Sequence, residues 1–430
     1  MNATFAGDTR QPARESNIAA IVSYFEQGIK PVGGPGELGI ELEHILVHDD
    51  MSPVSYSEEH GVAWLLDQLK EEYPALTRDA QGDLLGVARP GEAVTIEPAA
   101  QLELSAGPFV DLDRARKVFE AFESRIGSLL APVGERMLAT GYHPTAAARS
   151  LELIPKRRYQ FMDLYLGKKD AHGPCMMRGS ASTQVSIDYT STQDCLRKLR
   201  LAFALAPILS LICDNSPVFE GAPRTHELVR TEIWKHVDND RCGLVPDVFE
   251  PSFDLRRYAE YILDTVAILV PCDKEQWCYS ERTFGDIYAN RTMSRAEVEH
   301  ALSMFFTDVR LKTYIEIRPA DALPIPYAIA YAALVRGLFY SPASLDALDA
   351  LLSDVRAADY ESAKVALMEG GYRAEVYGRP VAELCDAVMN IAERGLGEGD
   401  RAHLEPLARL VADRTTLATL AERDRKGGAR

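Results

Sequence analysis

The sequence predicts an α+β protein in which a largely antiparallel sheet has a concave polar face and helices pack on its outer, apolar face. Four segments alternate polar and apolar residues with the two-residue period of a half-buried strand. The segments between them place apolar residues at helical spacing. An antiparallel sheet with one solvated face produces such alternation, and helices on its other face bury the apolar residues.

The first expected strand is "GIELEHILV" at 39–47, where two carboxylates interrupt an apolar run. Because successive side chains of a strand point to opposite faces, Glu41 and Glu43 share one face. Ile40, Leu42 and His44 share the other face. Half-buried strands commonly alternate in this way, so the strand alone leaves open whether its acids have a function.

Three further segments repeat the pattern and are expected to be strands of the same sheet. Candidate functional residues are expected on their polar faces. The polar positions are Gln101, Glu103 and Ser105 in "TIEPAAQLELSAG", with Glu97 just upstream; Ser182, Gln184, Ser186 and Asp188 in "SASTQVSIDYT"; and Lys312, Tyr314, Glu316 and Arg318 in "RLKTYIEIRPAD".

Helices are expected between these strands. Residues 111–130 carry an apolar stripe and acids at the start, where the helix dipole favours them. Residues 192–212 and 326–340 are strongly apolar and are expected to be core helices. From about residue 346 onward, charged and aliphatic residues alternate with few strand signals, which predicts a helical C-terminal portion over 346–430.

Composition excludes several classes of function. The chain has 430 residues and a formal net charge of −17, which repels polyphosphate backbones and argues against a nucleic-acid partner. Its longest apolar stretch, "LAFALAPILSLIC", is too short for a membrane span, and the N-terminus lacks a signal pattern. We therefore expect a cytoplasmic protein with small-molecule substrates and no membrane partner.

The seven cysteines form no C-x-x-C pair. Their odd number and scattered positions favour reduced thiols over a disulfide framework and argue against structural zinc.

Five glutamates from three strands are expected to crowd the polar face. Like charges at short range repel each other, and partial burial raises the cost of their charge. Lys312 and Arg318 cannot balance five carboxylates. All-oxygen ligand sets suit Mg²⁺ or Mn²⁺, and Gln184 can add an amide oxygen. A polar cavity satisfied by water and salt bridges is the alternative. The five are Glu41, Glu43, Glu97, Glu103 and Glu316.

Phosphate-cradling loops are absent from the sequence, since "GGPGELG" at 33–39 leads into a strand and is expected to be a turn. A nucleotide would therefore have to be held by metal ions and cations. The short basic segment "PKRRYQF" at 155–161 is either a solvated surface or a rim that steers an anionic small molecule.

Seven segments, in this order over residues 37–345, resemble the plant-type glutamate-cysteine ligases, a carboxylate-amine ligase family with a glutamine synthetase-like fold. The resemblance implies a catalytic domain over 15–345, with 346–430 packed on the same domain. The segments are "GIELEH", "IEPAAQLELS", "IPKRRYQFMDLYL", "MMRGSASTQVSIDY", "DNSPVFEG", "IWKHVDNDRCGLVPDVFEPSFDLRRYAEYILD" and "DVRLKTYIEIRPADALP".

The resemblance implies that the side-chain carboxylate of L-glutamate attacks ATP to give a γ-glutamyl phosphate, which the amine of L-cysteine then attacks. This reaction is the first step of glutathione-type thiol synthesis. The expected oligomeric state is a monomer or a homodimer. A carboxylate approaching a triphosphate is an anion meeting an anion, so metal ions must neutralise the phosphates.

Motif position implies a role for each candidate residue. Arg318 and Glu316 are the catalytic candidates, because a cation there stabilises charge on the transferring phosphoryl group. Lys312 and Arg318 are the ATP-binding candidates. The metal candidates are Glu41, Glu43, Glu97, Glu103, Gln184 and Glu316, and the substrate-binding candidates are Arg230, Trp234 and Arg241. In an acidic protein, the alternative role for Arg230 and Arg241 is a surface ion pair.

The sequence departs from the family pattern in parts of the expected substrate wall. Family members commonly read R-T-C-T-V-Q-V-N where this chain reads "GSASTQVS", so an arginine is missing or displaced to Arg178 and Ser186 replaces an asparagine. The acceptor amine is therefore open. A carboxylate-amine ligase with another amine is one alternative, and a metal- or nucleotide-binding homologue without turnover is another. Glu316 with Arg318 argues against the last, since binding alone needs no phosphoryl-stabilising cation.

Overall fold

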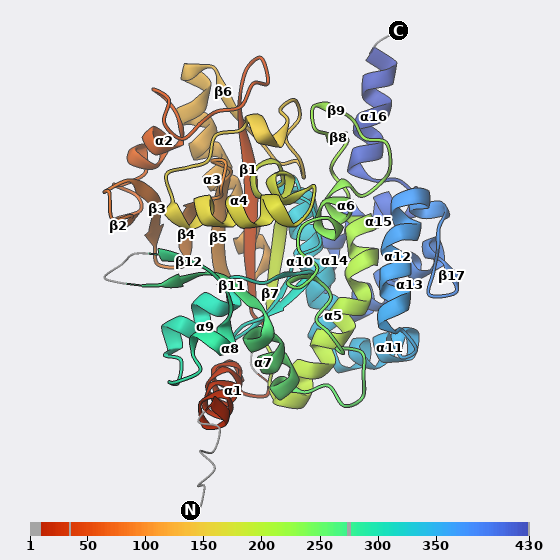
Figure 1. Ribbon diagram of the computed structural model, residues 1–430. Coiled ribbons are helices and arrows are strands. Elements are labelled where there is room, and N and C mark those ends of the chain that lie inside the picture. The colour runs from red at the N-terminus through yellow and green to blue at the C-terminus, as the bar shows by residue number, and fades with distance from the viewer. Residues whose placement is uncertain (1–9, 34–35, 273–276, 429–430) are drawn as a thin grey trace, which may run out of the picture.

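The computed structural model describes residues 10–33, 36–272 and 277–428 (Figure 1). Its centre is a nine-stranded sheet in which every pair of neighbouring strands is antiparallel. This confirms the α+β class with a largely antiparallel sheet. The order is β14 (Val309–Leu311), β15 (Ile315–Ile317), β7 (Thr183–Ile187), β1 (Leu38–His48), β5 (Leu102–Phe109), β4 (Glu92–Ile96), β3 (Leu84–Arg89) and β2 (Ala75–Arg78), and β6 (Glu135–Leu138) pairs with the last residues of β1.

The register of the central strands brings the acids together. Glu43 on β1 lies opposite Glu103 on β5, and Glu41 lies opposite Gln184 on β7. Glu316 on β15 lies two strands away from Glu41, in the same sheet. Directly opposed residues point to the same face of a sheet, so polar residues from four strands share one surface.

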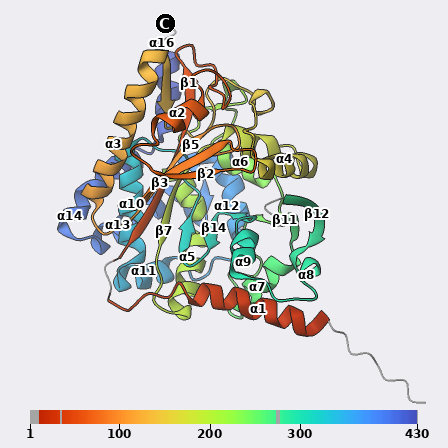
Figure 2. The same cartoon turned by 90° about the vertical axis from the view of Figure 1, so that its left-hand side faces the viewer.

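The apolar face of the sheet is covered by three helices, which correspond within a residue or two to the expected ones. Helix α3 (Leu112–Leu130) contacts β5 and β6, α10 (Ile325–Phe339) contacts β1 and β7, and α5 (Thr192–Ile212) contacts β14 and β15. Figure 2 shows α3 and α10 on one side of the sheet. Burying Ile40 and Leu42 completely on this side leaves the other face for polar side chains.

The polar face is partly roofed by α4 (Arg157–Lys169), which lies across the sheet in Figure 1, and by the π-helical turn Cys175–Gly179. Helix α6 (Val229–Lys235) flanks the same side. The remaining elements before the C-terminal helices are α1 (Arg10–Glu26), α2 (Val62–Gln68), β8 (Val218–Phe219), β9 (Ala222–Pro223), β10 (Cys242–Gly243), α7 (Leu255–Asp264), β11 (Val266–Pro271), β12 (Trp277–Thr283), α8 (Phe284–Ile287), α9 (Arg295–Leu302) and β13 (Phe306–Thr307).

From Pro342 onward the described chain is helical apart from one pair of two-residue strands. Helices α11 and α13 pack against α10 and α5, so this segment buries the outer side of the helices that cover the sheet. None of the helices in the described part combines the length and the apolar character that a bilayer crossing needs. The elements are α11 (Pro342–Leu352), α12 (Ala357–Gly370), β16 (Glu375–Val376), β17 (Arg379–Pro380), α13 (Val381–Gly395), α14 (Glu398–Arg401), α15 (Glu405–Ala412) and α16 (Leu417–Gly428).

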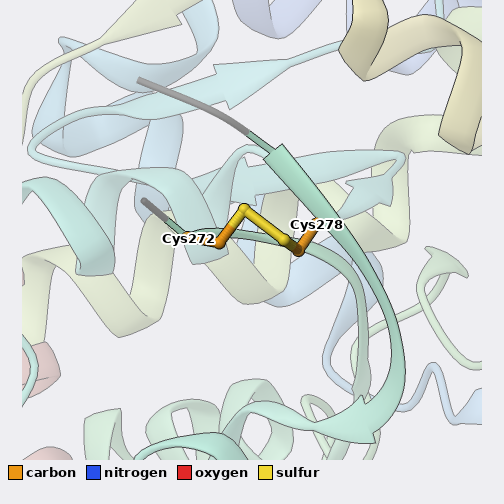
Figure 3. The surroundings of a disulfide bond; sticks show 2 residues. All are labelled: Cys272 and Cys278. Carbon is orange, nitrogen blue, oxygen red and sulfur yellow. A yellow bond between two sulfur atoms is a disulfide. The ribbon is translucent and has the colours of Figure 1, made fainter. Parts of the chain in front are cut away.

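The expectation of seven reduced thiols is wrong for one pair. Cys278 in β12 forms a disulfide with Cys272, which directly follows β11 (Figure 3). Antiparallel pairing places Val270 opposite Cys278 and Pro271 opposite Trp277, which brings the two sulfurs within bonding distance. Cysteine count and spacing along the chain do not reveal such cross-strand proximity. The other five cysteines are buried and free.

Candidate functional site

A cavity of about 360 Å³ opens on the polar face of the sheet. The structure brings nine of the predicted site residues to its wall. β1, β5 and β7 supply the floor, the turn after β4 supplies one side, and α6 and the segment around β15 supply the other. The nine are Glu41, Glu43, Glu97, Glu103, Gln184, Arg230, Trp234, Lys312 and Arg318.

The carboxylates on this floor are short of positive charge. Burial, followed by the charges of Glu103 and Glu316, raises the pKa of Glu41 to about 8. Burial raises the pKa of Glu103 to about 8, with further increases from Glu97 and Glu43. The pKa of Glu43 rises to about 7, again mainly by burial. Carboxyl groups held in this way favour either protons or an added cation.

Hydrogen bonds orient these acids without using all of their oxygens. Glu43 accepts from the Ser182 backbone N–H at 2.7 Å and from the Ser182 hydroxyl at 2.9 Å. The Thr95 and Ser105 hydroxyls both donate to Oε1 of Glu103, at 2.8 and 3.0 Å. No side chain in the described part donates a hydrogen bond to Glu41. The donor set left facing the cavity is made of carboxylate oxygens, which fits Mg²⁺ or Mn²⁺.

Glu316 has different surroundings from the other acids. It is fully buried, its Oε2 lies 2.6 Å from Arg310 Nε and 2.9 Å from Arg318, and its Oε1 lies 3.1 Å from Lys312 Nζ. Although burial opposes ionisation, these three cations hold the pKa of Glu316 well below its ordinary value. Glu316 does not line the cavity. Contrary to the expectation of a metal ligand, its oxygens bind cationic side chains of the protein.

Gln184 also differs from the expectation of a metal ligand. Its side-chain oxygen accepts a hydrogen bond from Arg318, and its Nε2 donates to Glu43 at 3.1 Å. The amide therefore lies between the acidic and the cationic side chains and fixes their relative positions. Arg318, held by Gln184 and Glu316, lines the cavity.

Arg230 and Trp234 face the cavity from α6. The guanidinium of Arg230 donates to the Ala320 carbonyl at 2.7 Å, while its buried Nε has no hydrogen-bond partner among the described residues. Arg230 is thus a buried cation with a free donor, which suits an anionic substrate group.

The structure does not bring Arg241 to the cavity. Arg241 is completely buried, and its guanidinium binds Asp238 at 2.7 Å and the carbonyls of Met304 and Val266. All of these hydrogen bonds are to other residues of the chain. Arg241 therefore stabilises the fold and does not make the substrate contact expected for it.

Three further cations of the site were missed as candidates. Lys156 and Arg158, in the basic segment before and within α4, line the cavity, and burial lowers the pKa of both. This supports the rim alternative for that segment. Arg310 on β14 faces Glu316 across the β14–β15 pair. Its two-residue spacing from Lys312 was the signal that could have identified it.

A second cavity of about 510 Å³ lies on the same face of the sheet and shares Glu41 with the first. Its wall is less polar and includes Pro108, Ala93 and Tyr314, with Lys30 and Arg89 as cations. Two cavities that meet at a carboxylate can hold two reactants with their reacting groups side by side.

Comparison with known proteins gives a family. The family model described as glutamate-cysteine ligase family 2 matches residues 37–427. The chloroplastic glutamate-cysteine ligase B of Oryza sativa subsp. japonica is 28% identical over 384 residues, covering 87% of this chain and 77% of that protein. The chloroplastic glutamate-cysteine ligase of Nicotiana tabacum is 28% identical over 402 residues, covering 90% and 76%. These matches confirm the resemblance seen in the sequence.

A solved structure shows the same fold. The glutamate-cysteine ligase of Francisella tularensis, crystallised in complex with AMP, superposes with a TM-score of 0.58 at 12% sequence identity. The match covers 91% of this chain and 85% of that protein.

Proposed function

The chain belongs to glutamate-cysteine ligase family 2, a family of ligases, and from this we propose the reaction and the roles of its residues. The reaction joins the side-chain carboxylate of L-glutamate to the amine of L-cysteine. ATP supplies the activating phosphoryl group, and γ-glutamylcysteine, ADP and phosphate are the products. The observation that carries the proposal is a sheet face on which uncompensated carboxylates lie beside the cations Arg318 and Lys312.

The carboxylates are proposed to hold Mg²⁺ or Mn²⁺. Glu41, Glu43, Glu97 and Glu103 supply the oxygens. Burial and neighbouring carboxylates raise the pKa of Glu41, Glu43 and Glu103, which favours an added cation beside them. When bound, such ions neutralise phosphate charge and hold donor and acceptor in line.

The cations on the opposite side are proposed to stabilise the transferring phosphoryl group. Glu316 and Gln184 each accept a hydrogen bond from the guanidinium of Arg318, which fixes its plane before ATP arrives. Preorganised cations of this kind lower the barrier because they need no rearrangement during the reaction. Glu316 acts here as a positioning residue for Arg318, and Lys312 as a second phosphate-binding cation.

The two cavities are proposed to receive different reactants. The larger and less polar cavity suits the nucleoside part of ATP, because apolar walls bury a flat ring system well. The smaller cavity, with Arg230, Lys156 and Arg158 in its wall, suits the charged amino-acid groups. Glu41, common to both, lies where phosphate and carboxylate meet.

The test is ADP release at constant glutamate, with cysteine, other amines or no acceptor supplied in turn. We expect ADP release to be fastest with cysteine. A faster rate with another amine would make the chain a carboxylate-amine ligase of different specificity, which the departures in "GSASTQVS" favour as the second candidate. No ADP release with any acceptor would contradict the proposed ligase activity.

A further inference from the structure

A second group of potential metal ligands lies away from the proposed active site. His48 ends β1, Glu135 begins β6 and lies directly opposite it, and Glu58 comes from the loop before α2. The His48 Nε2 atom is 3.4 Å from Glu58 Oε2, and its Nδ1 atom is 3.7 Å from Glu135 Oε1. One ligand atom from each residue falls within 4.8 Å of the other two.

Glu135 gives an independent sign that a cation belongs here. Its side chain is only 2% exposed, and its Oε2 has no hydrogen-bond partner among the described residues. Burying a carboxylate oxygen without a partner is costly. His48 approaches the other oxygen, with Nδ1 3.7 Å from Oε1, which exceeds the usual length of a hydrogen bond, so the imidazole does not supply a partner for Oε2.

We propose that His48, Glu58 and Glu135 bind a divalent ion of the zinc class. One imidazole nitrogen and two carboxylates form a mixed nitrogen and oxygen set of the kind that Zn²⁺ accepts. A tetrahedral ion with bonds of ~2.0–2.2 Å keeps its ligand atoms about 3.3–3.6 Å apart. Only one ring nitrogen of His48 can be a ligand, so only one of its two distances bears on this spacing. The 3.4 Å from Nε2 to Glu58 Oε2 agrees with it. A water molecule completes the set.

The proposed site is distinct from the carboxylates of the cavity. His48 is five residues beyond Glu43, about 16 Å along an extended strand. It also has the parity of Leu42 and Leu46, so it points to the opposite face from Glu43. An ion here would tie the loop that carries Glu58 to the end of the sheet, which is a structural role.

The competing explanation is a protonated His48 that forms two ion pairs without metal. The experiment compares zinc content and zinc titration calorimetry of the full-length protein with those of Glu58→Gln and His48→Gln, all in excess Mg²⁺ to occupy the cavity carboxylates. Glu152→Gln is the matched control, because Glu152 contacts Ser57 of the same loop but lies outside the group. Near-UV circular dichroism verifies that each variant is folded.

We expect the unsubstituted protein and Glu152→Gln to bind one more equivalent of zinc than Glu58→Gln and His48→Gln. Zinc should raise the unfolding midpoint in the first two proteins only, while ADP release by Glu58→Gln stays unchanged. Equal zinc stoichiometry in all four proteins would overturn the proposal. If His48→Gln does not fold, Glu58→Gln on the part-exposed loop still decides, because loss of the extra equivalent supports the site and retention of it refutes the site.

Discussion

The acids on β1 and β5 and the acid on β15 are the same residue type on one sheet, yet their electrostatics are opposite. Glu103 is buried and Glu41 half-buried beside other carboxylates, and the pKa of each is raised to about 8. Glu316 is buried more deeply than either, yet Arg310, Lys312 and Arg318 hold its pKa well below the ordinary value. The difference teaches that burial alone does not decide the state of a carboxylate. The cations around Glu316 come from the chain itself, whereas the carboxylates on β1 and β5 are left short of positive charge.

Removing divalent metal should have the largest effect, because it acts on the acidic side alone. After exhaustive chelation we expect ADP release to fall below detection, since the carboxylates would then repel both one another and the phosphates of ATP. Adding Mg²⁺ or Mn²⁺ back should restore the rate. Full activity in the chelated protein would show that the acidic side functions without an added cation. The proposed difference between these carboxylates and Glu316, which is neutralised by cations of the chain, would then be wrong.

Single ligand replacements should have the next largest effect. Glu41→Gln and Glu103→Gln each remove a charge from the acidic side, and we expect kcat to fall by about a hundredfold or more. Both variants should remain folded, since the amide relieves repulsion between neighbours. The measurement is steady-state ADP release with a thermal unfolding scan on the same preparation.

Glu120→Gln is the matched control, because Glu120 is an exposed acid that pairs with Arg116 on α3. Its rate should equal that of the unsubstituted protein. If Glu41→Gln or Glu103→Gln kept the full rate and the same metal requirement, that residue would be removed from the proposed metal-binding set.

On the cationic side, Arg318→Lys and Arg310→Lys should separate chemistry from structure. Lysine keeps the charge of Arg318 but loses the planar guanidinium, so we expect kcat to fall about a hundredfold with little change in KM for ATP. Arg310 is buried and also donates to the Phe305 carbonyl at 3.0 Å. Arg310→Lys should therefore lower the unfolding midpoint more than it lowers kcat.

Measuring kcat, KM and the unfolding midpoint for both lysine variants gives the comparison. An unchanged kcat in Arg318→Lys would remove that residue from the proposed mechanism. A loss of stability in Arg318→Lys, with the rate of the folded enzyme intact, would assign it the structural role expected for Arg310.

Sequence periodicity was sufficient to place the acids on a common face. Alternation along a strand depends only on local geometry, so Glu41, Glu43 and Glu103 could be placed on one face before any pairing was known. The core helices could be predicted equally well, because the spacing of their apolar residues is a local property of the sequence.

Periodicity could not show which partner each side chain would find. Arg241 donates to the carbonyls of Met304 and Val266, and Cys272 bonds to Cys278 across a strand pair. Contacts between separate segments of this kind leave no local pattern in the sequence. For the same reason, Glu316 and Gln184 were grouped with the metal ligands, although their oxygens bind cationic side chains. The alternation identified the face, whereas only the fold showed that Arg310 lies opposite Glu316.

The smallest expected effect is on the pH dependence of stability. In metal-free protein, Glu41 and Glu103 titrate near pH 8, above the ordinary value of 4.5 that applies to the unfolded chain. Between these values the native state retains protons that the unfolded state has lost, so the free energy of unfolding falls as pH rises. We expect the unfolding midpoint to drop by at least several degrees from about pH 5.5 to 8.5. Each proton that only the native state retains is worth about 1.4 kcal/mol per pH unit in this window, and each kcal/mol shifts a midpoint by about 2 °C or more.

Two controls tie this slope to the acidic side of the face. Mg²⁺ at the higher pH should raise the midpoint again, because it takes the place of the lost protons, and Glu103→Gln should flatten the metal-free slope. Glu316 has a depressed pKa, so its contribution to stability is lost only as pH falls below 4.5 and lies outside this window. If the metal-free slope were equally steep with and without Glu103→Gln, titration of Glu41 and Glu103 would not be its cause. The electrostatic difference between the acidic and the cationic sides of the face would then need another explanation.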